Sequence, residues 1–275
     1  MKVFNQRPKE KLIKSSMNTI EVQKKEAIQT QSSRADQFAD SYVTLETDAY
    51  EDCFKYSRHQ LHKLLKKYLP QDGTGLRLLD AGCGTGHHIA QLRERGYEVA
   101  GVDASKEMLE HARINNPDSV ILEADVDEIP LPDASFDIVL SIEVLRHLPG
   151  SAKCISEMSR LLKTGGFCLV TATPLLNLNG YALINQITHK IKISDLAQHK
   201  QSFHTSARLQ KEFSEAGFSS VEIHGVYIGP INWIARIFPK GLSSALKKWE
   251  AIDESLADKS VLRELSNMFL IKAVK

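Results

Sequence analysis

Three glycines on alternate positions, Gly82, Gly84 and Gly86, follow a short apolar run that contains Asp80. A helical pattern of apolar residues begins at Ile89. A strand, a glycine turn and a helix form the unit with which a parallel sheet brings a nucleoside to the carboxyl ends of its strands. Because glycine lacks a side chain, this loop suits close approach by a flat, uncharged or cationic ligand.

The glycine spacing argues against a dinucleotide. A dinucleotide loop has the spacing G-x-G-x-x-G and seats a phosphate on the helix N-terminus. Here the third glycine comes one residue early, and His87 occupies the sixth position. We therefore expect a nucleoside ligand other than NAD.

Two further acids end predicted strands. Asp103 lies about 20 residues beyond the glycine loop, where a carboxylate can accept both ribose hydroxyls. The alternative role for Asp103 is to cap the helix that begins near Ser105. Asp125 ends the next strand and could accept from an adenine amino group, while the Val126 amide meets a ring nitrogen. The alternative for Asp125 is a solvated loop acid.

Short apolar runs alternate with helical segments along the chain, which predicts an α/β fold with a doubly wound, mostly parallel sheet. A turn at Lys163–Gly166 precedes one of the predicted strands. The strands are expected at residues 78–80, 97–103, 119–125, 135–141, 167–171, 221–223 and 268–274.

Taken together, these motifs resemble the class I S-adenosylmethionine-dependent methyltransferases over about residues 50 to 228. The resemblance rests on five segments in order: Leu79–Gly86, Asp103, Ala124–Asp125, Phe136–Val139 and Leu162–Gly166. It implies a Rossmann-like sheet of seven strands with the last strand antiparallel. It also implies that S-adenosyl-L-methionine is the methyl donor.

The resemblance assigns roles to individual residues. The glycine loop would lie against the methionine moiety, Asp103 would hold the ribose, and Asp125 with Val126 would hold the adenine. Ile142 would line the site near the methyl group. Arg58 would pair with the methionine carboxylate; the alternative is a solvated helix face. The remaining residues that we assign to the donor site are Asp80, Cys83, Ala104, Met108 and Ser141.

Within that class, the segment Ser141–Leu148 is similar to the E-x-x-E-H motif of ubiquinone-type and related small-molecule O-methyltransferases. Glu143 and His147 are kept, but Arg146 replaces the second acid that some members use for a divalent metal. We therefore expect no metal.

For a hydroxyl acceptor, His147 is the first choice as general base, because an ordinary imidazole titrates near pH 6.5. The alternative is a structural histidine. Glu143 is the second choice, near the sulfonium or orienting His147. His199 and His204 come third, as residues of a lid, and the alternative for each is a surface histidine.

The composition narrows the function classes. The formal net charge is +1, and no patch combines basic and aromatic residues, so nucleic acid is not an expected partner. No apolar run approaches the length of about 20 residues that a membrane span needs. The four scattered cysteines favour reduced thiols and a cytoplasmic location.

The chain divides into three parts. Residues 1–35 are polar and are expected to be a mobile N-terminal segment. Residues 36–72 are expected to form an N-terminal helical cap. Residues 73–275 are expected to form the methyltransferase domain, with lid-like insertions at about 174–204 and 229–262.

Apolar residues of these insertions predict a lid over the carboxyl ends of the strands. The residues of this predicted lid are Leu183, Ile184, Ile187, Trp233, Ile234, Ile237 and Phe238. Such a lid suggests a bulky, apolar acceptor that is phenolic, isoprenoid-bearing or lipid-like, with peripheral membrane contact. The alternative is that these residues pack on one another or form a dimer contact. The predicted activity is O-methylation of a small metabolite or lipid. The alternatives are a non-catalytic cofactor-binding subunit and an N- or C-methyltransferase of another small molecule.

Overall fold

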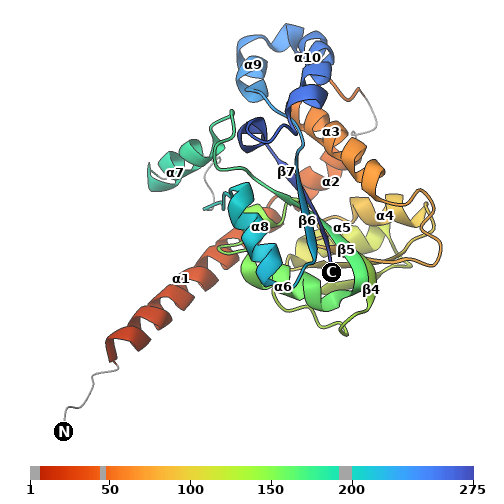
Figure 1. Ribbon diagram of the computed structural model, residues 1–275, viewed down its shortest axis with the longest axis vertical. Helices are drawn as coiled ribbons and strands as arrows, with labels where there is room; N and C mark the ends of the chain where they lie inside the picture. The colour runs from red at the N-terminus through yellow and green to blue at the C-terminus, as the bar shows by residue number, and fades with distance from the viewer. Residues whose placement is uncertain (1–6, 44–47, 192–199) are drawn as a thin grey trace.

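A seven-stranded sheet organises the molecule (Figure 1). The computed structural model describes residues 7–43, 48–191 and 200–275. The strand order is β3-β2-β1-β4-β5-β7-β6, and β7 runs antiparallel to both of its neighbours. The other pairs are parallel, which confirms the doubly wound α/β fold with an antiparallel last strand. The strands are β1 (Arg77–Ala81), β2 (Glu98–Asp103), β3 (Val120–Glu123), β4 (Phe136–Ser141), β5 (Leu162–Ala172), β6 (Ser220–Gly225) and β7 (Phe269–Val274).

Helices cover both faces of the sheet, and three of them begin with a side-chain cap. Asp52, Ser105 and Thr205 each accept a hydrogen bond from a backbone N–H of the first turn. Such caps satisfy N–H groups that have no partner inside the helix. The helices around the sheet are α3 (Cys53–Tyr68), α4 (His87–Arg93), α5 (Lys106–Asn115), α6 (Ala152–Leu161) and α8 (Ser206–Glu215), with the short 3-10 helix η1 (Leu145–His147) after β4.

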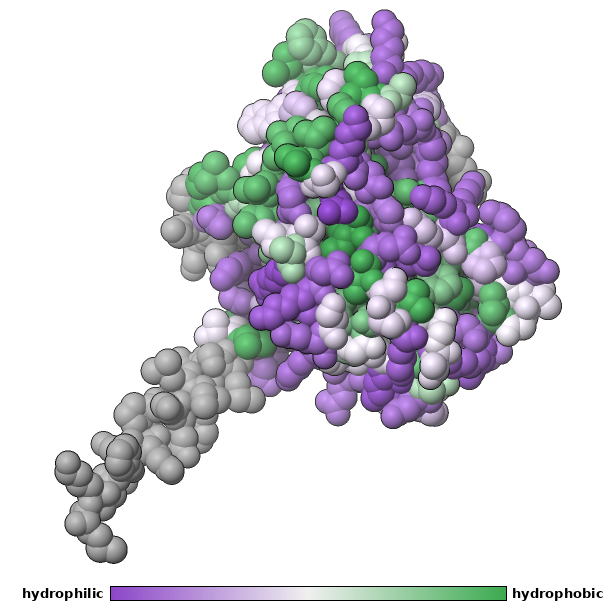
Figure 2. All heavy atoms as spheres, viewed as in Figure 1, coloured by the Kyte–Doolittle hydropathy of each residue, from purple (hydrophilic) through white to green (hydrophobic). Residues whose placement is uncertain are grey.

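Two insertions extend the fold beyond this core. The first contains α7 (Tyr181–Ile191), and the second contains α9 (Ile231–Ile237), the 3-10 helix η3 (Pro239–Gly241) and α10 (Leu242–Leu256). The short helix η4 (Leu262–Leu265) leads into β7. In Figure 2 hydrophobic residues gather on the surface over α7 and α9.

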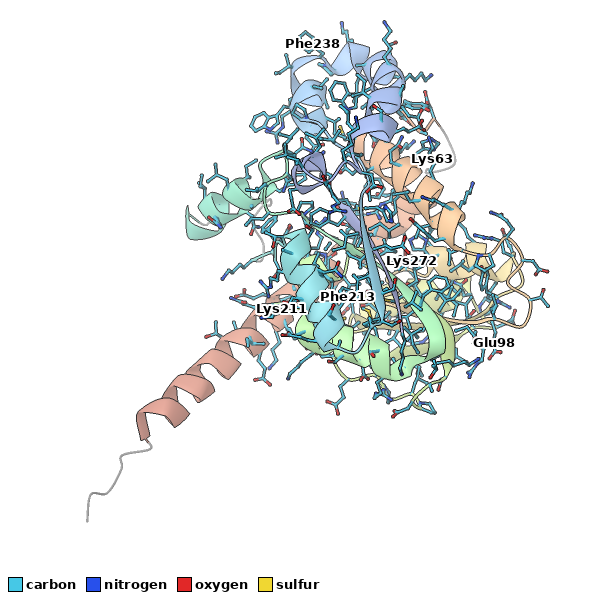
Figure 3. The ribbon with its side chains drawn as sticks, viewed as in Figure 1. Lys63, Glu98, Lys211, Phe213, Phe238 and Lys272 are labelled. Carbon is cyan, nitrogen blue, oxygen red and sulfur yellow. The ribbon has the colours of Figure 1, made fainter. Side chains whose placement is uncertain are left out.

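The core is split by the sheet, because successive strand residues point to opposite faces. Leu78 and Ile138 face a cluster with α3, α4 and α5. Leu79 and Val139 face a second cluster with α6 and α8. Figure 3 shows Phe213 on α8 at the sheet, whereas Phe238 lies at the outer tip of the second insertion.

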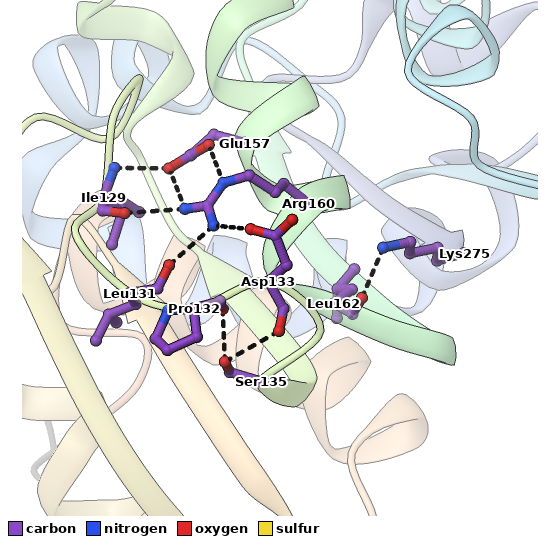
Figure 4. Close-up of polar contacts among 9 residues, drawn as sticks. All are labelled: Ile129, Leu131, Pro132, Asp133, Ser135, Glu157, Arg160, Leu162 and Lys275. Carbon is purple, nitrogen blue, oxygen red and sulfur yellow. Dashed lines mark hydrogen bonds and ion pairs between the residues drawn. The ribbon is translucent and has the colours of Figure 1, made fainter.

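Arg160, at the end of α6, holds the long loop between β3 and β4 (Figure 4). Its guanidinium donates to the carbonyl oxygens of Ile129 and Leu131 at 2.9 Å and 2.8 Å. Glu157 accepts from the same guanidinium and from the Ile129 backbone N–H. These contacts give the loop a defined path from the end of β3 back to the start of β4.

Several boundaries differ from the sequence-based expectations. β3 ends at Glu123, so Asp125 lies in the following loop rather than in the strand. The expected turn at Lys163–Gly166 lies within β5, where the pairing with β4 shifts register between Phe136 and Ile138. A bulge of this kind absorbs extra residues without ending the strand.

The N-terminal segment is helical from residue 7. Helix α1 (Arg7–Ser32) extends away from the sheet (Figure 1) and is followed by α2 (Ala35–Val43). The sequence predicts a mobile segment at residues 1–35, whereas α1 occupies residues 7–32 of it. The last turns of α1 contact α5, and Ala27 and Thr30 are buried there.

Candidate functional site

The glycine loop connects β1 to α4 at the carboxyl edge of the sheet. The N–H groups of Gly82 and Cys83 donate to the Val102 carbonyl oxygen at 2.7 Å and 2.9 Å, which ties the loop to β2. All three loop glycines have positive φ, a region that residues with a side chain rarely adopt. A Cβ on Gly82 would lie 2.2 Å from the Val144 side chain, whereas a Cβ on Gly84 would enter open space. Gly82 is therefore needed for packing, and Gly84 leaves room for a ligand.

Asp103 closes the loop from the neighbouring strand. Its Oδ2 accepts from the Gly84 N–H at 2.9 Å, and its Oδ1 accepts from the Ser105 N–H at 2.8 Å. The cap of α5 is Ser105 itself, whose hydroxyl accepts from the Met108 N–H. Burial raises the pKa of Asp103, and the N–H groups of Ser105 and Gly84 lower it in part. The carboxylate thus lies beside the loop, and its role there is not that of the helix cap.

Asp80 is a second buried acid behind the loop. It is 1% exposed, and its Oδ2 has no hydrogen-bond partner among the described residues. Burial and the charge of Asp103 raise the pKa of Asp80 to about 7. A buried carboxyl oxygen without a partner is costly, and a cationic or hydrogen-bonding ligand would offset that cost.

Asp125 lies in the loop that follows β3. Its Oδ1 accepts from the Asp127 N–H at 2.9 Å, and the next residue, Val126, is buried. Lys24 of α1 donates to both oxygens of Asp125, at 2.9 Å and 2.7 Å. The adenine acid expected from the sequence is therefore also the anchor of the N-terminal helix.

The other expected donor-site residues lie around this loop, mostly as packing elements. Cys83 is buried, and burial raises the pKa of its thiol well above the usual value, so the thiol stays protonated. The fully buried Ser141 hydroxyl donates to the Ala81 carbonyl oxygen at 3.0 Å and joins β4 to β1. Met108 and Ile142 are buried as well, and Ala104 is half-buried.

Glu143 follows β4 in a left-handed backbone conformation, with φ of 64°. Its N–H donates to the Thr171 hydroxyl at 2.6 Å, and its carboxylate lies 2.5 Å from the Arg146 guanidinium. Arg58 of α3 lies 3.9 Å from the same carboxylate. Burial raises the pKa of Glu143, but Arg146 and Arg58 outweigh burial and leave the pKa below its usual value. Non-glycine residues with positive φ cost about 1–3 kcal/mol and cluster at functional sites.

Arg58 reaches this site from the helical cap, as expected, and its side chain is buried rather than solvated. Its guanidinium lies over the Phe54 ring at 5.0 Å. Its charge lowers the pKa of both Glu143 and His87.

The predicted base, His147, lies on η1 directly after Arg146 and is half-buried. His204 is 2% exposed and packs in the protein interior, contrary to the surface alternative, and burial lowers its pKa to about 4. His199 lies outside the described residues.

A group of polar residues around Tyr181 was not expected from the sequence. Tyr181, at the start of α7, accepts a hydrogen bond from the Asn232 amide of α9. Burial raises the pKa of Tyr181, while Arg146 lowers it and Glu143 raises it slightly. Burial also raises the pKa of Tyr227, with Tyr181 and Glu143 adding to the effect. Tyr181 directly follows the loop at residues 177–180. This position is the only feature of the sequence that could have pointed to Tyr181.

Three histidines form a second group that the sequence did not reveal. The His62 ring of α3 stacks on His87 with centroids 6.3 Å apart and meets His88 edge-on at 5.8 Å. Burial lowers the pKa of His62 and of His87 to about 4, and that of His88 further. All three are therefore neutral near pH 7, and they join the helical cap to the first turn after the glycine loop. Among the described residues, no group of His, Cys, Asp or Glu is arranged to hold a metal ion.

The geometry as a whole suits a ligand that carries a ribose and a positive charge. Acids line the glycine loop at Asp80 and Asp103, and the loop leaves open space at Gly84. At the end of β4, the Glu143 carboxylate pairs with Arg146 and lies 3.9 Å from Arg58. The charges of Glu143 and Arg146 also shift the pKa of Tyr181 on α7.

Comparison with known proteins points to a methyltransferase domain. Residues 79–170 match the family model described as a methyltransferase domain. A probable S-adenosylmethionine-dependent methyltransferase of Mycolicibacterium smegmatis is 31% identical over 172 residues, which is 61% of this chain and 62% of the relative. The malonyl-[acyl-carrier protein] O-methyltransferase of Yersinia pestis is 34% identical over 122 residues, or 44% of this chain and 45% of the relative. The chain thus spans less than two thirds of these two relatives.

The ubiquinone biosynthesis O-methyltransferase of Psychrobacter arcticus is 27% identical over 188 residues, covering 63% of this chain and 72% of the relative. Among solved structures, a possible histamine N-methyltransferase of Thermotoga maritima has a TM-score of 0.59 at 18% identity and covers 90% of this chain and 99% of its own. A Haemonchus contortus N-methyltransferase solved with S-adenosylhomocysteine has a TM-score of 0.54 at 23% identity and covers 79% of this chain and 52% of its own. At these identities the structural likeness supports the fold.

Proposed function

Residues 79–170 form a methyltransferase domain of the S-adenosylmethionine-dependent class, and from this premise we propose that the whole chain methylates a hydroxyl group of a small, apolar acceptor. The observation that carries the proposal is the junction at the end of β4. There Val144 packs against Gly82 of the glycine loop, and the preceding residue, Glu143, pairs with Arg146. The charges of Glu143 and Arg146 also shift the pKa of Tyr181 on the first insertion.

The residues present fit the donor. The Oδ2 atom of Asp80 is buried without a partner among the described residues, and Gly84 leaves open space. Asp103 is oriented by two backbone N–H groups, which leaves further lone pairs of both oxygens for ribose hydroxyls. When bound, S-adenosylmethionine supplies an activated methyl group. Arg58 would hold its carboxylate, and Asp125 with Val126 would hold its adenine.

The protein's own contribution is to position, desolvate and deprotonate. We assign His147 as the general base, because an imidazole nitrogen can accept the proton of a hydroxyl acceptor and His147 lies on η1, directly after the end of β4. Glu143 is a poor base, since Arg146 and Arg58 hold its pKa below the usual value. Glu143 instead places a fixed negative charge beside the reacting centre and orients the groups around it.

The acceptor class follows from the insertions. Leu183, Ile187, Trp233, Ile237 and Phe238 are exposed, whereas Ile184 and Ile234 are half-buried. An acceptor with an isoprenoid, phenolic or lipid-like body would match them. Peripheral contact with a membrane, where such molecules reside, belongs to the same proposal. Cytoplasmic location and the absence of a metal requirement remain predictions.

Two variants test the proposal. Asp103→Ala should weaken binding of S-adenosylmethionine about 30-fold or more by calorimetric titration, because charge-assisted hydrogen bonds are lost. His147→Ala should leave that affinity within about twofold, yet lower transfer of labelled methyl to a lipid extract at least about 100-fold. If wild-type protein binds S-adenosylmethionine but transfers no label to the extract, the result would favour the non-catalytic cofactor-binding subunit. Label on an amine or a carbon would replace O-methylation by the N- or C-alternative.

A further inference from the structure

The two insertions expose large apolar side chains on the same side of the molecule (Figure 2). On α7, Leu183 is 64% exposed and Ile187 is 47% exposed. On the second insertion, Trp233 is 45%, Ile237 65% and Phe238 64% exposed. These five residues are here called the apolar tip. Figure 3 places Phe238 at the outer end of α9, far from the sheet.

Hydrogen bonds join the two halves of the apolar tip. The Trp233 indole N–H donates to the Asn179 carbonyl oxygen at 3.3 Å. The Asn232 backbone N–H donates to the Asn179 side-chain oxygen at 3.1 Å, and the Asn232 amide donates to Tyr181. The two insertions therefore present one surface of defined shape.

The charge of the second insertion is one-sided. Residues 226–249 contain no Asp or Glu, and their basic residues are Arg236, Lys240, Lys247 and Lys248. The whole chain has 35 basic and 34 acidic residues, so this imbalance is local. The Arg236 guanidinium lies 5.6 Å from the centre of the Trp233 ring. Every residue from Arg236 to Gly241 is exposed, so two cations flank Ile237 and Phe238.

We propose that the apolar tip, with Arg236 and Lys240 beside it, docks on the surface of an anionic lipid bilayer. Exposed Trp and Phe flanked by Lys and Arg enter the boundary between headgroups and acyl chains, where the cations meet anionic phosphates. A second copy of this chain is disfavoured, because a twofold interface would bring Arg236 and Lys240 of the two copies together without a nearby acid in the tip. No described helix is long and apolar enough to cross a bilayer, so the contact is peripheral.

The proposal rests on the proposed function and extends it to the route of the acceptor. Asn232 of the second insertion donates to Tyr181, whose pKa is shifted by the charges of Arg146 and Glu143. A lipid-like acceptor would pass from the bilayer under the tip to the end of β4 without entering water.

Co-sedimentation of the full chain with vesicles tests the docking surface. Wild-type protein should bind vesicles of phosphatidylglycerol and phosphatidylcholine, and bind pure phosphatidylcholine vesicles more weakly. The double variant Ile237→Ala, Phe238→Ala should lower the partition coefficient about tenfold or more, because two apolar side chains no longer enter the membrane. The matched control is Ile114→Ala on α5, an equally exposed apolar residue that should bind as wild type does.

A second pair of changes separates charge from apolar insertion. Arg236→Gln with Lys240→Gln should abolish the preference for anionic vesicles while weak binding to phosphatidylcholine remains. Binding of the Ile237, Phe238 double variant at the wild-type level would overturn the proposal. A concentration-dependent dimer in light scattering that this variant dissociates would also overturn it, in favour of self-association. Titration of the same samples with S-adenosylmethionine separates the two proposals. Donor binding without vesicle binding overturns only the docking surface. Lack of donor binding overturns the proposed methyltransferase function.

Discussion

The ammonium group of Lys24 lies 2.7 Å from Oδ2 of Asp125, although the two residues are 101 positions apart in the chain. Lys24 also pairs with Asp127. Burial lowers the pKa of Lys24, but hydrogen bonds to both acids outweigh it and raise the pKa above its usual value. This contact brings the N-terminal helix to the loop that we assign to the adenine of the donor. Ser32, which hydrogen-bonds to Ser105 at 2.8 Å, extends the contact toward Asp103.

Removing this ion pair should loosen α1. In Lys24→Met the mostly buried Asp127 carboxylate loses its cation, so we expect a loss of about 1 kcal/mol of unfolding free energy. Amide hydrogen exchange should become faster over residues 19–32. Lys25→Met is the matched control, because Lys25 is exposed on the same helix. Equal exchange rates in the two variants would show that the ion pair does not hold the helix.

Two loop glycines should respond differently to the same change. In Gly82→Ala the new Cβ would collide with the Val144 side chain, so the protein should lose stability and its melting temperature should fall by several degrees. Gly84→Ala meets open space and should lose only about 1 kcal/mol from its positive φ. It should nevertheless weaken donor binding at least about tenfold, since the methyl group fills ligand space. If Gly84→Ala folds and binds the donor as tightly as wild type does, the assignment of the glycine loop to the donor site would be contradicted.

The neutral histidine group should make the protein sensitive to acid. For His62 and His87 the folded pKa is about 4, below the ordinary value of 6.5. Between these values the unfolded chain binds more protons, so stability rises with pH from about 4 to 6.5 and is lost as pH falls through that window. Chemical denaturation at several pH values should show this slope, and His62→Phe should reduce it.

The control for this measurement is His59→Phe, a half-buried histidine on the same helix that lies outside the histidine group, and His62→Phe should reduce the slope more than His59→Phe does. Asp80, with a pKa of about 7, and Asp253, with a pKa of about 6, act in the opposite direction, because their folded forms hold protons above the unfolded pKa. Comparing variant with wild type cancels their contribution. If His62→Phe and His59→Phe have the same slope, the histidine group is not the cause.

Arg146 should control the acceptor half of the site. In Arg146→Met the Glu143 carboxylate keeps only Arg58 at 3.9 Å, so the pKa of Glu143 should rise. We expect transfer to an active acceptor to fall roughly ten- to 100-fold, with the acidic limb of the pH–rate profile moved to higher pH. Arg146→Lys keeps the charge and should restore most of the rate. A wild-type pH profile in Arg146→Met would exclude Arg146 from setting the charge of Glu143.

The donor half was predictable from the sequence because its determinants are local. The glycine loop, Asp103 and the strand ends depend on turn chemistry and on alternating apolar residues, which act over a few neighbouring positions. The parallel sheet then places all carboxyl ends at one edge, so Asp80, Asp103 and Glu143 were expected near one another.

Only the tertiary structure showed the polar group around Glu143 and the helical contacts. The pairs Lys24–Asp125, Tyr181–Asn232 and His62–His87 join residues from different elements, and each depends on how helices pack across the sheet. No local pattern marks such a pair, because its energy comes from desolvation and charge at a position that packing alone creates. The sequence by itself therefore determined the sheet, the glycine loop and the class of donor that we propose. The tertiary structure decided which charges surround Glu143 and how the N-terminal helix meets Asp125, because both depend on burial between distant segments.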